Sequence, residues 1–130
     1  MRLHRDESGA VTVELALVTP LLVLVLVGAV QFALVYHARS VAQTAAVEGA
    51  RLAASEGYTL EDGALRVRRL LDAGLGDVGE TFAVSAEAEG DVVIAQARGS
   101  YPLFIPWVTP LSVPIEASAE VWREAFRDEP

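Results

Sequence analysis

Few residues of this sequence combine the type and spacing that chemistry requires. The run Gly74-Leu75-Gly76-Asp77-Val78-Gly79 matches G-x-G-x-x-G, which binds a dinucleotide when a strand precedes it and a helix follows. Here the patterns predict a helix before it and a strand after it, so we interpret it as a Gly-rich turn. The two histidines, His4 and His37, flank a long apolar run at opposite ends. They cannot share a metal within one chain.

Charged side chains also form no evident reactive group. Arg66, Arg68 and Arg69 cluster on one predicted helix, and an exposed helix face explains them. Glu87 and Glu89 share one face of a predicted strand, where we expect solvent. The sequence therefore predicts neither a catalytic constellation nor a cofactor, and we do not expect an enzyme.

Length and composition narrow the class of protein. The chain has 130 residues, enough for one compact domain and an anchor. Its net charge is −8, without any Lys, so it lacks the basic footprint of a nucleic-acid-binding protein. It contains no Cys, which excludes disulfides, Cys-ligated zinc and a thiol nucleophile.

An uncharged apolar run, residues 15–36, stands near the start. As a helix it would be roughly 33 Å long, which matches a hydrocarbon core of about 30 Å. A buried core helix is the alternative, but so small a domain has little interior to hide it. Arg2, Arg5 and the amino terminus favour a cytoplasmic N-terminus. We therefore expect a single-pass anchor in membrane lipid, with the C-terminal domain outside the cytoplasm.

Glu14 lies at the head of this run. A carboxylate at the edge of a membrane helix is unfavourable unless it faces headgroups or a partner. It could simply lie in the interface and complement the helix dipole. The alternative is contact with a partner chain.

The surroundings of Glu14 resemble a known family. A short charged leader ends at Gly9, Glu14 follows five residues later, and Pro20 lies within the helix. Residues 8–20, and the small-residue stretch 45–53 with its Gly-Ala-Arg, are similar to TadE-like proteins, minor pilins or pseudopilins of the tight-adherence (Flp) pilus. The resemblance implies that a prepilin peptidase cuts between Gly9 and Ala10. It also implies a role for Glu14 in processing or assembly with other pilin or pseudopilin subunits.

The remaining patterns predict an α+β, pilin-like fold. Apolar residues at helical spacing extend the first helix from about Ala10 to Ser55. A capping-box-like Thr59 and Asp62 begin a short second helix, to about Ala73. Three alternating runs then predict a three-stranded antiparallel sheet with one apolar face. Its inward residues are Phe82, Val84, Ala86 and Ala88, then Val93, Ala95, Ala97 and Tyr101, then Ile115, Ala117, Ala119 and Val121.

The segment between the last two strands, residues 101–110, is unusually apolar. Prolines recur there every four residues, and proline cannot donate to a ladder, so we expect a loop. Leu103, Phe104 and Trp107 could fold back over the core. The alternative is a docking surface for another subunit or the membrane.

These observations divide the chain into four parts. We expect a leader peptide at 1–9, a transmembrane helix at 10–37, its extracytoplasmic continuation at 38–57 and a small α+β domain at 58–130. The expected function is that of a membrane-anchored TadE-like minor pilin or pseudopilin, a structural component of a Tad-type pilus. The alternative is a single-pass anchored binding module unrelated to pili.

Overall fold

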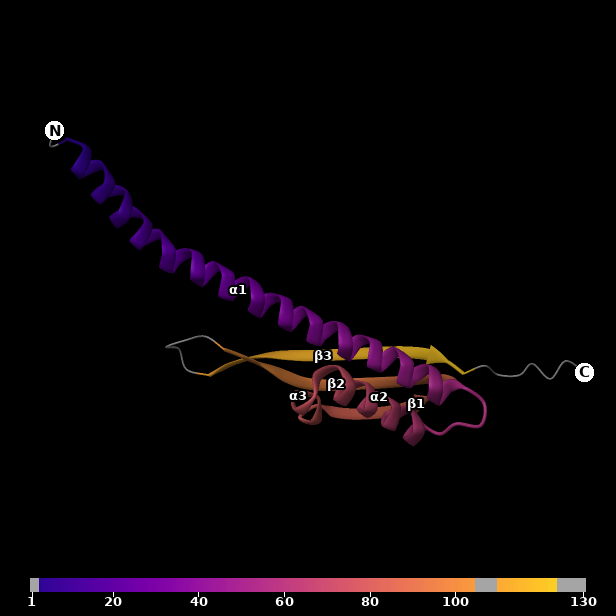
Figure 1. The fold of residues 1–130 in the computed structure, drawn as a ribbon. Coiled ribbons are helices and arrows are strands. Elements are labelled where there is room, and N and C mark those ends of the chain that lie inside the picture. Colours follow the sequence, from indigo (N-terminus) through magenta and orange to yellow (C-terminus); the bar gives the residue numbers. More distant parts are fainter. Residues whose placement is uncertain (1–2, 105–109, 124–130) are drawn as a thin grey trace, which may run out of the picture. The chain divides into compact units, whose positions relative to one another are not determined.

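The computed structural model describes the backbone of residues 3–104 and 110–123, with side chains from residue 7 onward. Its elements are α1 (Leu3–Ala54), α2 (Leu60–Leu75), α3 (Asp77–Glu80), β1 (Ala83–Glu89), β2 (Val92–Leu103) and β3 (Leu111–Trp122), as Figure 1 shows. Two compact units divide the chain, residues 1–33 and residues 34–130. A long apolar helix, shorter helices and a three-stranded antiparallel sheet confirm the predicted α+β fold.

Helix α1 begins at Leu3, earlier than the predicted start near Ala10. No proline precedes Pro20, and a single glycine such as Gly9 costs a helix only about 1 kcal/mol. The helix therefore continues through the Gly9–Ala10 bond. Pro20 also lies within α1. Just before it, the Thr19 hydroxyl donates to the Leu15 carbonyl at 2.7 Å.

In the first unit, the described residues belong to α1, and their apolar side chains from residue 10 onward are mostly exposed. Leu17 is 73% exposed and Phe32 is 74% exposed. Among the described residues, one helix is long and apolar enough to cross a membrane, and none of its most apolar stretch is buried. This apolar stretch is therefore not part of the core of the domain, to which α1 contributes only residues from Ala38 onward. Such a helix fits a membrane anchor.

Helix α2 begins at the predicted capping box. The Asp62 amide donates to the Thr59 hydroxyl at 3.1 Å, and the Thr59 amide donates to Asp62 Oδ2 at 2.9 Å. The Thr59 hydroxyl donates to the same carboxylate oxygen at 3.0 Å. The hydrogen bonds from the Thr59 amide and hydroxyl to the carboxylate lower the pKa of Asp62. The helix ends at Leu75, and its C-cap is Gly76, whose φ of 57° suits glycine. The interpretation of residues 74–79 as a turn was wrong except at Gly76, because Gly74 and Leu75 end α2 and Asp77–Glu80 forms a short helix, α3, which the sequence did not predict.

The sheet order is β1-β2-β3, and both pairs are antiparallel. The register aligns Val84 with Ala97 and Ala97 with Ala117, so the three predicted apolar faces form one face. That face packs against the second half of α1 and against α2. The buried core comprises Ala38, Ala42, Ala45, Ala46, Ala50, Val67, Leu71, Phe82, Ala95, Ala97, Ile115 and Ala117.

The last two strands extend into the segment predicted as a loop, so the prediction was wrong for residues 101–103. The Arg123 amide donates to the Asp91 carbonyl at 2.7 Å, which marks a hydrogen-bonded pair. Such pairs alternate along an antiparallel ladder. Pro102 and Pro114 both fall on the intervening, non-hydrogen-bonded positions. Neither proline removes a ladder bond, because both nitrogens face the side without a partner strand.

Candidate anchoring and assembly regions

The predicted processing residues lie on one exposed stretch of α1. Gly9, Ala10 and Glu14 are all exposed. Ala10 and Glu14 are four residues apart and therefore share one side of the helix. A Cβ built on Gly9 would have nothing within 4 Å. Glycine at this position is thus not required by packing within the chain.

The small-residue stretch 45–53 has a packing role instead. Ala45, Ala46 and Ala50 are fully buried, and Gly49 faces α2. A Cβ on Gly49 would clash with the Val67 side chain and lie 2.8 Å from the Gly63 carbonyl oxygen. A Cβ on Gly63 would lie 2.6 Å from the Ala53 Cβ. Glycines on both helices therefore permit α1 and α2 to approach closely.

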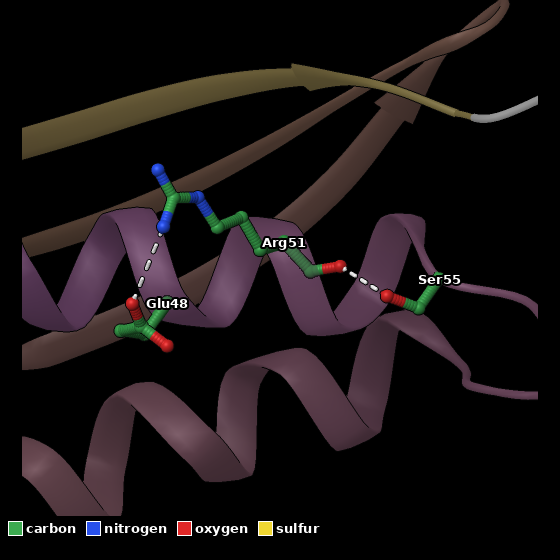
Figure 2. A network of polar contacts seen from close by, with 3 residues as sticks. All are labelled: Glu48, Arg51 and Ser55. Carbon is green, nitrogen blue, oxygen red and sulfur yellow. Dashed lines mark hydrogen bonds and ion pairs between the residues drawn. The ribbon is translucent and has the colours of Figure 1, made fainter.

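Arg51, which follows Gly49-Ala50, points away from this crossing. Figure 2 shows its guanidinium beside Glu48, with Nη1 3.6 Å from Oε1. The Arg51 side chain is 67% exposed, so the pair contributes at most about 1 kcal/mol. The Ser55 hydroxyl donates to the Arg51 carbonyl at 2.8 Å, near the end of α1. These contacts of Glu48, Arg51 and Ser55 stabilise the end of α1. They do not resemble a reactive site.

Comparison with known families identifies this same part of the chain. Residues 9–51 match the family model described as TadE-like protein. The chain carries a TadE-like segment. That segment begins at Gly9 and ends at Arg51, so it includes the apolar helix and the small-residue face that receives α2. No curated protein and no solved structure matches the chain.

The predicted docking residues lie outside the TadE-like segment, at the end of β2. Leu103 is the last residue of β2 and is half-buried. Phe104 follows it and is 76% exposed, so it does not cover the core. Trp107 lies outside the described residues.

Two polar side chains have roles that the sequence did not predict. Arg68, interpreted as exposed, is partly buried and donates to the carbonyls of Gly79 and Phe82 at 2.9 and 2.6 Å. It ties α2 to α3 and to the residue that precedes β1. The Gln43 amide donates to the Ser118 carbonyl of β3 at 3.1 Å. Both bonds join residues distant in sequence, so no local pattern predicts them.

The described residues contain no group of three or more His, Cys, Asp or Glu that could hold a metal ion. The geometry of these regions is suited to anchoring and packing: an exposed apolar helix, a close helix crossing and an apolar strand end.

Proposed function

We propose that this chain is a membrane-anchored TadE-like minor pilin or pseudopilin, a structural component of a Tad-type pilus without catalytic activity. The main support is the TadE-like match, which begins at Gly9, the residue where the charged leader ends. The apolar, exposed helix that follows supplies the anchor. Other pilus components are the expected partners.

The proposed division of labour follows the order of the chain. Residues 1–9 form a leader that a prepilin peptidase removes, and residues 10–37 cross the membrane. Residues 38–57 continue the helix outside the cytoplasm and carry the α+β domain of residues 58–130. Until assembly, the helix rests in the bilayer with its N-terminus in the cytoplasm.

Processing is tested at the mature N-terminus. We expect N-terminal sequencing of the membrane-extracted protein to begin at Ala10 in a host with its own prepilin peptidase. Gly9→Val should block cleavage. Gly28→Val is the matched control, because both glycines lie in α1 with nothing within 4 Å of a built Cβ. An intact residue 1–9 segment in the unaltered protein would contradict the processed-pilin proposal.

One observation favours the alternative of a simple anchored binding module. The Gly9–Ala10 bond lies within α1, so a peptidase must first unwind a hydrogen-bonded helix to reach it. The helix unwinds most easily at Gly9, because glycine is less favourable in a helix than alanine by about 1 kcal/mol. A mature protein that keeps its leader would support the binding module. A start beyond Tyr36 would contradict both proposals, because the anchor itself would be lost.

A further inference from the structure

We propose that the paired ends of β2 and β3 contact the surface of the bilayer that holds the anchor helix. This inference rests on the anchoring part of the proposed function and not on the pilus. The region concerned, here called the β2–β3 ribbon, comprises the described residues 99–104 and 110–115.

The composition of the ribbon is that of a lipid-facing surface. The sequence holds no charged residue between Arg98 and Glu116. Phe104 is 76% exposed and Leu111 is 48% exposed. Soluble domains commonly expose single apolar residues, whereas exposed apolar side chains that lie together on an uncharged surface are typical of a contact with a membrane or a protein.

The ribbon projects beyond the rest of the sheet. β1 pairs with β2 only as far as Ala83, which lies opposite Arg98. From Gly99 onward β2 pairs with β3 alone, up to Leu103 opposite Leu111. Figure 1 shows these two strands running on past β1.

The direction of the projection follows from the helix contacts. α2 runs antiparallel to α1, since Gly63 lies against Gly49 and Gly74 lies against Val41. α3 comes directly after that second contact. A shallow cavity of about 350 Å³ lies between α3 and the ribbon. Asp77, Val78 and Thr81 line it on the α3 side, and Ser100, Pro102 and Ser112 line it on the ribbon side. The ribbon therefore lies at the Val41 end of this unit, toward Leu34, and not at the Ala54 end.

Distances along the chain place the ribbon end near the expected membrane boundary. Gln43 and Ser118 are hydrogen-bonded and mark a common level on α1 and β3. The stretch of β3 from Ser118 back to Leu111 is about 23 Å. The helix from Gln43 back to Tyr36, where the apolar run ends, is only about 10 Å. The ribbon is thus long enough to pass the level of Tyr36 even when the strand is tilted.

The backbone limits how deep the ribbon can go. At Ser100 the amide and carbonyl face the side where β1 has ended, so they have no ladder partner there. Unpaired backbone groups are excluded from hydrocarbon but not from the hydrated interface. Because the ribbon contains no Lys or Arg, its contact with lipid should be apolar and independent of anionic headgroups.

The chain contains no cysteine, so single labels can test this placement in the full-length protein. Phe104→Cys carries an environment-sensitive fluorophore, and the protein is reconstituted in phosphatidylcholine vesicles. Glu89→Cys, in the hairpin at the opposite end of the sheet, is the matched exposed control. Leu24→Cys reports on the anchor.

We expect nitroxide-labelled lipid to quench the label at position 104 several-fold more than the label at position 89, with the reverse order for aqueous acrylamide. Added salt or anionic lipid should not change this order. Equal, water-like quenching at positions 104 and 89, with lipid quenching at position 24, would overturn the inference and leave the anchor intact. Shielding at position 104 that disappears on tenfold dilution with lipid would assign the ribbon to a second copy instead. Water-like quenching at position 24 would overturn the anchor and this inference together.

Discussion

Glu14 is the only acidic residue between Ala10 and Tyr36, and its side chain is exposed on α1. Under the proposed processing, Ala10 gains a charged amine one helical turn away. Two helices packed side by side with an axial offset can place the Glu14 of one near the amine of the other. Such a pair is worth about 0–1 kcal/mol in water. An unpaired acid at the centre of a membrane helix costs about 2.5–3.5 kcal/mol, and less near the edge of the membrane. Because the pair itself is weak, its main effect would be to set the axial register of the two helices.

We predict that Glu14→Ala leaves the protein folded and membrane-inserted but impairs its co-purification with pilin partners. Glu14→Asp should be intermediate, because the charge remains while the side chain is shorter. Pull-down from detergent extracts at equal expression measures the effect. Wild-type association of Glu14→Ala would mean that Glu14 is only an interfacial carboxylate.

Asp62, at the start of α2, should make the stability of the domain depend on pH. Hydrogen bonds from Thr59 lower the pKa of Asp62 in the folded state below the ordinary value of 3.8. Its contribution is therefore complete above that value and is lost as the pH falls through the lower, folded-state pKa. Thermal unfolding of the full chain in detergent, from pH 6 downward, measures this loss.

Two variants separate this cap from general acid effects. Asp62→Asn should flatten the acid limb of the stability profile, whereas Glu61→Gln, in the same turn, leaves the capping box intact. Thr59→Ala should lower the free energy of unfolding by about 1 kcal/mol. If the unaltered protein and Asp62→Asn lost stability equally as the pH falls, the cap would not account for the loss of stability in acid.

At the level of elements, the crossing of α1 and α2 decides how the domain is built on its helix. Gly49 and Gly63 bring the two backbones so close that the carbonyl oxygen of each lies under 3 Å from a Cβ built on the other. These carbonyl oxygens are backbone atoms, which cannot turn aside as a flexible side chain can, and the side chains of Val67 and Ala53 lie at least as close. Glycine is therefore needed here for space and not for an unusual φ.

We expect Gly63→Ala to destabilise the domain. Alanine favours a helix over glycine by about 1 kcal/mol, but overpacking a close crossing costs roughly 1–3 kcal/mol. The net loss should be up to about 2 kcal/mol in the free energy of unfolding, measured by denaturant titration of the full chain in detergent. Gly28→Ala, with open space around its Cβ, should be neutral or slightly stabilising. Equal behaviour of the two variants would exclude the crossing as a constraint.

For the whole molecule, the charges beside the apolar helix give a prediction of its orientation in the membrane. Arg2, Arg5 and the amino terminus precede it, and His37 and Arg39 follow, so the bias toward a cytoplasmic N-terminus is small. The domain beyond His37 is acidic and, among its described residues, holds no second helix able to cross.

We predict that protease added to intact spheroplasts digests the chain beyond His37. A C-terminal epitope should be lost, while a cytoplasmic control protein remains intact. Full protection of the epitope, with digestion after lysis, would reverse the orientation.

The sequence by itself determined the features that depend on local periodicity. The apolar run, the α+β class, the capping box of Thr59 and the inward faces of the strands all follow from neighbours in sequence. Tertiary structure decided what depends on distant partners. Arg68 is partly buried because the carbonyls of Gly79 and Phe82 converge on it, and Pro102 lies in a strand because β1 ends before reaching it. The repeated prolines predict a loop. Only the register of the strands shows that the nitrogen of Pro102, which carries no hydrogen, lies on the side of β2 that has no partner strand.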